Sequence, residues 1–184
     1  MQEGTGLTEF ARKYPDRLFD VGIAEGHAVS MAGGMAKQGL VPVFAVYSSF
    51  LQRGYDQLLQ DVALDGLHVV LGVDRAGLVG ADGETHHGCF DALYLSQVPH
   101  MTVLCPASFA ELRQMLRRTV LELTGPVAVR YPRGGEGAYQ DCCGNETFTQ
   151  VRPGADCTIL TYGVLINEAL AAAELLKGGG IDLR

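Results

Sequence analysis

The sequence predicts an α/β protein in which a parallel sheet carries helices on both faces. Short runs rich in Val, Ile and Leu alternate along the chain with stretches of helical periodicity. The short runs are almost unbroken in their apolar character, which is typical of parallel strands buried on both faces. Repeated strand–helix–strand order favours a parallel sheet, because the crossover helices pack back onto it. With 47% hydrophobic and 19% charged residues among 184, the chain has the composition of a globular protein.

The expected elements follow from these patterns. We expect strands at residues 17–21, 41–47, 67–73, 101–105, 126–130 and 157–163. We expect helices at residues 26–38, 50–64, 108–123 and 166–177. The third helix has the clearest start, because Ser108 is followed three residues later by Glu111, the pattern of a capping box. Gly39 and Gly178 lie where helix-ending glycines are expected.

The alternation stops in the glycine-rich, polar stretch 131–156, and this break predicts the domain organisation. We expect residues 1–135 to form the first α/β domain and residues 136–156 to act as a linker. Residues 157–184 resemble the truncated start of a second α/β domain, because one strand, one helix and the beginning of a further strand cannot close a core. We therefore expect this sequence to be part of a longer natural chain.

Charge and motifs exclude several classes of protein. A formal net charge of −7 argues against a nucleic-acid binder, which normally carries a basic face. No signal peptide is evident and the apolar runs are too short to span a bilayer, so we expect a cytoplasmic location. The five cysteines lack CxxC spacing, so we expect reduced side chains and no metal site in this chain. The fingerprints of dinucleotide-binding domains, P-loops and nucleophile elbows do not occur.

Polar residues follow several predicted strands, at the edge where open parallel sheets bind their ligands. They comprise Glu25, residues 47–53, Asp74, Arg75, Arg130, Tyr131 and Arg133. The third strand also leads into a long loop, residues 77–88, which carries Asp82, Glu84, His86 and His87 among four glycines. Long loops inside compact domains are usually functional. We therefore expect a site at this edge that binds an anionic small molecule.

Four blocks of sequence carry a resemblance to a known family. They are FDVGIAEGHAV at residues 19–29, YSSFLQRGYDQ at 47–57, DRAGLVGADGETHHGCFD at 74–91 and VRYPRG at 129–134. Together they resemble the pyrimidine-binding domain of transketolase-like thiamine diphosphate enzymes. The second and third blocks are most similar to the branch of that family that joins pyruvate to D-glyceraldehyde 3-phosphate with loss of carbon dioxide. The resemblance implies a transferase that serves the synthesis of isoprenoid precursors, thiamine and pyridoxal.

The resemblance implies a catalytic and cofactor-binding role for Glu25. This residue matches the glutamate that bonds N1′ of the cofactor's aminopyrimidine and relays a proton. A carboxyl group in an apolar wall suits the role, because desolvation favours its neutral form. Phe50 matches the aromatic residue that packs on the pyrimidine, and Arg53 matches a basic residue that orders the cofactor site. Taken alone, these residues fit equally well a helix-dipole carboxylate, a core aromatic and a solvated charge.

The resemblance also implies a substrate-binding site. Tyr47, Arg75, Asp82, His86 and Arg133 match positions that contact the acceptor aldehyde, its phosphate or the reaction intermediate. Arginine suits phosphate because its planar fork makes paired, charge-assisted hydrogen bonds. His86 also matches a catalytic position, since a histidine can bind substrate hydroxyls or move a proton near neutral pH.

The implied cofactors are thiamine diphosphate and Mg²⁺, and the implied substrates are pyruvate and D-glyceraldehyde 3-phosphate. Members of the family are homodimers. Their Mg²⁺ ligands and diphosphate contacts lie in a preceding domain that has no counterpart among these 184 residues, so we expect the chain alone to be inactive. Gly26 departs from the family pattern, which usually has a larger polar residue there, so the surroundings of Glu25 are expected to differ.

Two other functions stay open on the sequence alone. The chain could be one subunit of a natural split enzyme whose partner protein supplies the diphosphate half. It could instead be a non-catalytic α/β module that binds a phosphorylated metabolite. The second alternative explains the arginines but gives Glu25 and Phe50 no purpose.

Overall fold

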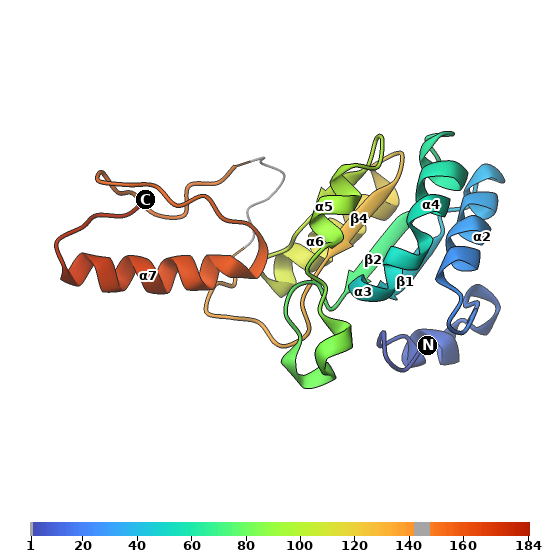
Figure 1. The fold of residues 1–184 in the computed structure, drawn as a ribbon, viewed down its shortest axis with the longest axis horizontal. Helices are drawn as coiled ribbons and strands as arrows, with labels where there is room; N and C mark the ends of the chain where they lie inside the picture. Colours follow the sequence, from blue (N-terminus) through green and yellow to red (C-terminus); the bar gives the residue numbers. More distant parts are fainter. Residues whose placement is uncertain (1, 142–147) are drawn as a thin grey trace. The chain divides into compact units, whose positions relative to one another are not determined.

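The computed structural model describes residues 2–141 and 148–184. Its strands form a four-stranded sheet in the order β1-β2-β4-β3, and every neighbouring pair is parallel (Figure 1). The strands are β1 (Val43–Tyr47), β2 (Val70–Asp74), β3 (Thr102–Leu104) and β4 (Val127–Arg130). Tyr47 pairs with Asp74, and Val73 with Arg130, so the carboxyl ends of three strands meet at one edge.

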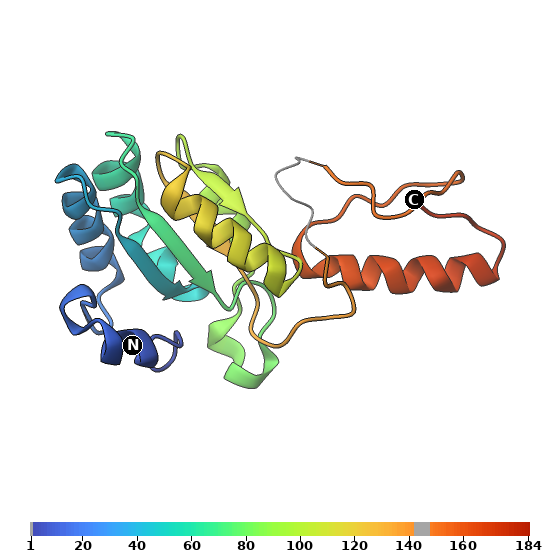
Figure 2. The same ribbon diagram turned by 180° about the vertical axis from the view of Figure 1, so that it is seen from behind.

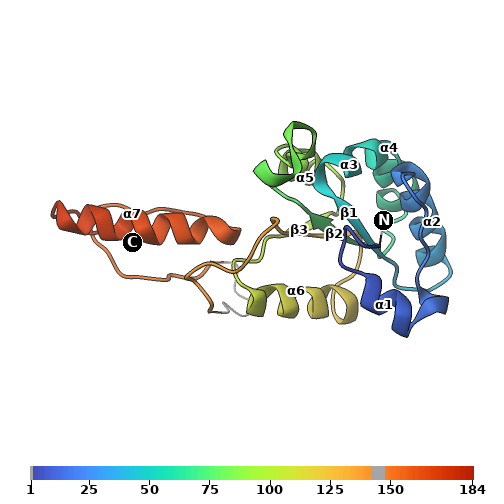
Figure 3. The same ribbon diagram turned by 90° about the horizontal axis from the view of Figure 1, so that it is seen from below.

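Helices and shorter helical turns connect the strands. The α-helices are α1 (Thr8–Lys13), α2 (Glu25–Lys37), α3 (Ser48–Leu51), α4 (Tyr55–Gln57), α5 (Asp91–Ser96), α6 (Phe109–Leu121) and α7 (Ile166–Gly178). The shorter turns are η1 (Pro15–Arg17), η2 (Gln52–Gly54), the π-helical η3 (Leu58–Ala63), η4 (Gly80–Asp82), η5 (Glu84–His86) and η6 (Gly163–Leu165). Figure 3 shows α2 to α5 on one face of the sheet, and α1 with the last turn of α6 on the other. The expected parallel α/β class with helices on both faces is confirmed.

The helix expected at residues 50–64 forms as a continuous series of helical turns, α3 to η3, which changes pitch along its length. This series packs very closely against α2. A Cβ atom on Gly33 would lie only 2.5 Å from the carbonyl oxygen of Asp61, and one on Gly54 would lie 3.0 Å from Val29 Cγ2. Glycine therefore allows the two backbones to approach. The close approach places the turn that carries Arg53 beside the first turn of α2.

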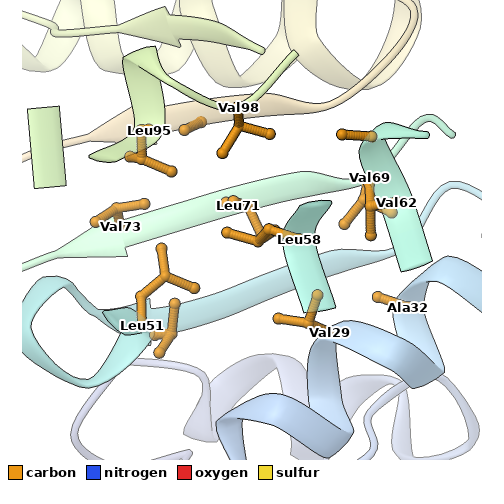
Figure 4. Close-up of a cluster of buried hydrophobic side chains, with 13 residues drawn as sticks. Val29, Ala32, Leu51, Leu58, Val62, Val69, Leu71, Val73, Leu95 and Val98 are labelled. Carbon is orange, nitrogen blue, oxygen red and sulfur yellow. The ribbon is translucent and has the colours of Figure 1, made fainter. Parts of the chain in front are cut away.

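The hydrophobic core lies between the sheet and the helices on one of its faces, as Figure 4 shows. Its fully buried side chains include Val29, Leu51, Leu58, Val62, Val69, Leu71, Val73 and Leu95. They come from α2, the α3–η3 series, β2 with the residue before it, and α5. Every residue of β2 is buried, as expected for a parallel strand covered on both faces. The core thus fixes the elements from which the site side chains project.

The strand expected at residues 17–21 does not form, and this expectation was wrong. After η1 the chain is neither helix nor strand as far as Ala24. Asp20 Oδ1 accepts a hydrogen bond from the Gly22 N–H at 2.9 Å, and Gly22 has a φ of +67°. An Asx turn followed by a left-handed glycine bends the backbone. Phe19 is consequently 62% exposed instead of lying in the sheet.

The strand expected at residues 157–163 is also wrong in extent. Cys157 forms only an isolated parallel bridge with Leu183. The Arg184 N–H donates to the carbonyl oxygen of Cys157 at 2.9 Å, and the Ile159 N–H donates to that of Arg184 at 2.8 Å. Two short helices, α1 and α5, were not expected from the sequence, because six residues are too few to show a helical period.

The chain divides into two compact units. One comprises Met1–Leu104 and Thr119–Arg133 and contains the sheet, and the other comprises Cys105–Arg118 and Gly134–Arg184. In the second unit, Asn167 Oδ1 accepts the Tyr139 N–H at 2.9 Å. Residues 142–147, inside the expected linker at 136–156, lie outside the described residues, so the domain boundaries stay predictions. Across residues 2–141 and 148–184, every helix is too short or too polar to cross a membrane.

Candidate active site

Side chains from three segments meet at the carboxyl edge of the sheet. Tyr47 ends β1 and Phe50 follows it, Arg75 follows β2, and His86 lies in the loop beyond Arg75. The rings of Tyr47 and Phe50 stack with their centroids 5.5 Å apart, and the His86 ring meets Phe50 edge-on at 5.1 Å. The guanidinium carbon of Arg75 lies 4.0 Å from the centroid of the Tyr47 ring. Residues that the sequence assigned to one site therefore contact one another.

Glu25, Phe50 and Arg53 form what we call the glutamate cluster. Glu25 is the first residue of α2 and is only 7% exposed. Its Oε1 accepts a hydrogen bond from Arg53 Nη1 at 3.1 Å, and the Arg53 guanidinium carbon lies 4.9 Å from the centroid of Phe50. Backbone N–H groups at a helix start favour a carboxylate there. Helix α2 and Arg53 together hold this carboxylate in a fixed orientation.

A pocket of about 890 Å³ opens beside β1 and has Glu25 in its wall. Tyr47 and Phe50 also line it, while residues such as Met31 and Val46 make most of the remaining wall apolar. The volume falls within the range of about 300–1,000 Å³ that is typical of small-molecule sites. An apolar wall with one buried carboxylate suits a flat heterocycle that presents a ring nitrogen.

Asp74, Arg75, Asp82 and Arg133 form a second group, which we call the arginine cluster. Arg75 Nε donates to Asp82 Oδ2 at 3.1 Å, and Arg75 Nη1 donates to Asp74. Arg133 donates to the other carboxylate oxygen of Asp82. Asp82 thus bridges the two arginines, and two guanidinium groups face two carboxylates. Charge in this cluster is balanced without any ligand.

The N-terminal segment reaches the same edge of the sheet. Arg75 Nη1 also donates to the carbonyl oxygen of Gly4 at 2.9 Å. Figures 1 and 2 show this segment and the loop 77–88 at the carboxyl ends of the strands. A segment distant in sequence therefore helps to fix Arg75.

Arg75 has an unusual backbone conformation. Its φ is +57°, a left-handed value that costs a non-glycine residue about 1–2 kcal/mol. Asp74 Oδ1 accepts the Arg75 N–H at 2.7 Å and stabilises this conformation. Burial by itself would lower the pKa of Arg75, but the carboxylates of Asp74 and Asp82 raise it above its ordinary value. Such strain is typical of functional positions, and it aims a permanently charged guanidinium at the Tyr47 ring.

Tyr131 adjoins the arginine cluster and ties β4 to the start of the loop. Its N–H donates to the carbonyl oxygen of Val73 at 3.0 Å, and its own carbonyl oxygen accepts the Ala76 N–H at 3.0 Å. Burial, with a smaller contribution from Asp74, raises the pKa of Tyr131 to about 12. The phenol is therefore neutral at physiological pH.

Every residue predicted for the site lies in one of the two clusters or, like Tyr47 and His86, contacts a member of one. Sequence reasoning named Asp74 and Asp82 at this edge and expected a structural ion pair for Arg130, but it did not predict which carboxylate pairs with which arginine. Asp91, a buried residue at the start of α5, accepts hydrogen bonds from Arg130 Nε at 2.9 Å and Nη2 at 3.0 Å. Asp91 lies in the third block of the resemblance, but nothing in the sequence paired it with Arg130. Among the described residues, no group of three or more His, Cys, Asp or Glu could hold a metal ion.

Residues 1–136 match the family described as transketolase, pyrimidine-binding domain. The match covers most of the chain, so the chain belongs to this family. A solved structure described as a split-gene transketolase, an inactive beta4 tetramer, is 28% identical with a TM-score of 0.82 over 98% of this chain and 60% of its own. A transketolase from Campylobacter jejuni shares the fold, with a TM-score of 0.78 at 20% identity over 90% of this chain and 27% of its own.

Within that class, this chain is similar to 1-deoxy-D-xylulose-5-phosphate synthases. The synthase of Chlorobaculum tepidum is 51% identical over 99% of this chain and 29% of its own length. The synthase of Clostridium kluyveri is 50% identical over 100% of this chain and 30% of its own length. The resemblance to the synthase branch is therefore confirmed. The chain spans about 30% of the length of these curated relatives.

Proposed function

We propose that this chain supplies the pyrimidine-binding half of the active site in a thiamine diphosphate-dependent transferase. The enzyme would condense pyruvate with D-glyceraldehyde 3-phosphate to 1-deoxy-D-xylulose 5-phosphate, with loss of carbon dioxide, and serve the synthesis of isoprenoid precursors, thiamine and pyridoxal. The observation that carries the proposal is the buried carboxylate of Glu25 in the wall of a large apolar pocket, next to an aromatic ring. Identity of about 50% to synthases over the whole chain supports the substrate pair.

The glutamate cluster would hold the aminopyrimidine of the cofactor. When bound, thiamine diphosphate supplies the electron sink that decarboxylation of a 2-oxo acid requires. Glu25 would bond the ring nitrogen N1′ and hold or release the proton there. Arg53 holds the carboxylate with a hydrogen bond of 3.1 Å, and the ring of Phe50, which lines the pocket, would pack on the pyrimidine. Because the carboxylate projects from a helix, its position needs little adjustment on binding.

The arginine cluster would bind the phosphate of the acceptor aldehyde. Arg75 and Arg133 are the two guanidinium groups at this edge that Asp82 bridges. A phosphate dianion can replace a carboxylate between two arginines and make paired hydrogen bonds with each. Asp82 must then leave at least one arginine, and it would turn with His86 toward the hydroxyl groups of the acceptor. The Tyr47 ring keeps the Arg75 guanidinium in place at 4.0 Å during the exchange.

Several components of this proposal lie outside the chain. The diphosphate of the cofactor and its Mg²⁺ would be bound by a separate diphosphate-binding domain, and two copies of the complete enzyme would form a homodimer. The 184 residues alone would then be inactive. A split enzyme, in which that domain is a separate protein, is the second candidate; the similarity to a split-gene transketolase over 98% of this chain favours it. The chemistry of Glu25 is the same in both arrangements.

A chimeric enzyme tests the proposal. In the Chlorobaculum tepidum synthase, the segment that matches this chain is replaced by the 184 residues, which are 51% identical to it. We expect the chimera to release carbon dioxide from pyruvate in the presence of D-glyceraldehyde 3-phosphate, thiamine diphosphate and Mg²⁺. Glu25→Gln should lower kcat by a factor of about 10² to 10⁴, the usual contribution of a positioned proton-transfer group.

The matched control is Glu9→Gln in α1. The Glu9 side chain is 85% exposed and pairs with the exposed Arg12, so kcat should not change. Circular dichroism shows whether each protein is folded. A folded chimera without activity, or one that keeps full activity with Glu25→Gln, contradicts the proposed function.

A further inference from the structure

His87 closes the loop at residues 77–88, which we call the acceptor loop. The Val79 N–H donates to His87 Nδ1 at 2.9 Å. At the base of the loop, Gly77 and Gly88 exchange two backbone hydrogen bonds, each 2.8 Å long. Val79 is only 3% exposed, so water has little access to its N–H group. One of the three hydrogen bonds that close the loop therefore depends on a titratable side chain.

The direction of this hydrogen bond fixes the protonation state of His87. A backbone N–H can only donate, so His87 Nδ1 must carry a free lone pair. In the imidazolium form both ring nitrogens carry protons and neither can accept. Protonation of His87 and the hydrogen bond from Val79 therefore exclude each other. Histidine is also the side chain that ordinarily changes charge between about pH 5 and pH 8.

Val79 connects His87 to the arginine cluster. The Asp82 N–H donates to the carbonyl oxygen of Val79 at 3.1 Å, so Val79 is bonded on one side to His87 and on the other to η4. Asp82 then bridges Arg75 and Arg133. His87 thus holds Val79 in place, and Val79 in turn holds the helical turn η4 that carries Asp82.

We propose that neutral His87 is a positioning residue that keeps the acceptor loop closed, and that its protonation loosens the loop as the pH falls. Because only the neutral form accepts the Val79 N–H, this hydrogen bond forms at high pH and is lost on acidification, while the two backbone hydrogen bonds between Gly77 and Gly88 remain. This effect on the loop follows from the geometry alone. Its consequence for the acceptor, weaker binding at low pH, rests on the proposed function.

The elements next to the loop carry several charged and titratable groups. They are Asp74, Arg75, Asp82, Glu84, His86 and Cys89 on β2 and the loop, Tyr47 at the end of β1, Asp91 and Tyr94 on α5, and Arg130, Tyr131 and Arg133 on or after β4. Three of the four carboxylates pair with arginines, and Glu84 is exposed. In the part of the chain that the structure describes, no carboxylate forms an ion pair with His87. Among the described residues, the imidazolium therefore gains no ion pair that would compensate for the lost hydrogen bond.

Amide hydrogen exchange of Val79, followed by NMR on the 184-residue chain, tests the proposal. After correction for the intrinsic pH dependence of exchange, we expect its protection to be about tenfold lower at pH 5.5 than at pH 8, the order of effect of one lost hydrogen bond. The amide of Leu71 in the fully buried strand β2 serves as the internal reference and should keep its protection.

Three variants separate positioning from a general effect of histidine. His87→Asn places an amide oxygen where Nδ1 accepts, and this oxygen does not titrate, so Val79 should stay protected at both pH values. His87→Leu offers no hydrogen-bond acceptor, so the Val79 amide should exchange at both pH values with the lower protection that the wild type has at pH 5.5. His100→Asn is the control, because His100 is exposed, lies outside the loop and has a φ of +62° that asparagine tolerates. It should behave like the wild type.

The chimera gives the functional readout. Its KM for D-glyceraldehyde 3-phosphate should rise between pH 8 and pH 6, with the KM for pyruvate unchanged, and His87→Asn should flatten that rise. Protection of Val79 that does not depend on pH in the wild type, or that depends on it equally in His87→Asn, would falsify the inference. An inactive chimera with the expected exchange pattern refutes the proposed function and leaves the effect on the loop intact.

Discussion

The glutamate cluster and the arginine cluster lie at the same edge of the sheet, but they are built in different ways. The glutamate cluster has one buried carboxylate and one arginine, both carried by helical turns whose backbones pack together through glycines. The arginine cluster has two carboxylates and two arginines, carried by loops and strand ends. One of its arginines has a left-handed backbone.

This difference indicates different tasks. A carboxylate on a packed helix presents one atom in one place, which suits proton transfer to a cofactor that stays bound. A charge-balanced set of loop residues can exchange an internal carboxylate for an external anion, which suits a substrate that enters and leaves. The comparison therefore predicts that the two clusters respond differently to substitution.

After Glu25→Gln, the largest effect is expected at Arg75. In the chimeric enzyme, Arg75→Ala should lower kcat/KM for D-glyceraldehyde 3-phosphate by a factor of about 100, since hydrogen bonds to charged groups contribute about 1.5–3 kcal/mol each. The KM for pyruvate should stay within about twofold, because the proposed role of Arg75 is to bind the phosphate of the acceptor. Steady-state kinetics measure both constants. Arg12→Ala, which removes an exposed arginine of α1, is the control and should change neither.

Arg75→Gly sharpens this prediction. Both substitutions remove the guanidinium group. Glycine also adopts the left-handed conformation at this position, where φ is +57°, without the strain that alanine would have. The glycine variant should therefore be about 1 kcal/mol more stable to unfolding than the alanine variant, with equally poor kinetics. Equal stability of the two variants would show that the backbone there is not strained.

The sequence predicted the glutamate cluster better than the arginine cluster, for a physical reason. Helix periodicity predicted a helix at residues 26–38, directly after Glu25, and the resemblance assigned Glu25, Phe50 and Arg53 to the same site. The partners of Arg75 and Arg133 depend on how separate loops approach one another, which no local pattern encodes. The prediction of a strand at residues 17–21 was wrong for a related reason. β-propensity does not show that Asp20 and Gly22 bend the backbone out of an extended conformation.

The next effect is expected in the scaffold of the glutamate cluster. Gly33→Ala should destabilise the protein by about 1–3 kcal/mol, because its Cβ would lie 2.5 Å from the Asp61 carbonyl oxygen and would push α2 from its neighbour. Gly34→Ala is a matched control in the same helix, since a Cβ there meets nothing within 4 Å. It should stabilise the protein by up to about 1 kcal/mol. Chemical denaturation measures both, and a Gly33→Ala protein as stable as the control would remove the packing argument.

A smaller effect, on phosphate affinity, is expected when Arg75 and Arg133 lose their shared carboxylate partner. Asp82→Asn removes the carboxylate that bridges Arg75 and Arg133, so inorganic phosphate should bind the 184-residue chain about tenfold more tightly. Isothermal titration calorimetry measures this affinity. Glu84→Gln makes the same change of charge at an exposed position of the same loop, so it controls for the net charge alone. Equal affinities in the two variants would mean that Asp82 does not compete with the anion.

The smallest effect is expected for Tyr131, which adjoins the arginine cluster. Its ionisation should change the free energy of unfolding at alkaline pH and have no effect at neutral pH. Burial raises the pKa of its phenol from 10.0 to about 12, so the folded state favours the neutral form. The unfolded chain ionises first as the pH rises, and the stabilisation, complete below about pH 10, is lost toward pH 12. Tyr131→Phe cannot ionise, so its free energy of unfolding should fall less between pH 9 and pH 11 than that of the wild type. Tyr14→Phe, at an exposed tyrosine, should follow the wild type. Denaturant titrations at the two pH values give the comparison, and identical losses in all three proteins would show that Tyr131 does not contribute to the alkaline instability.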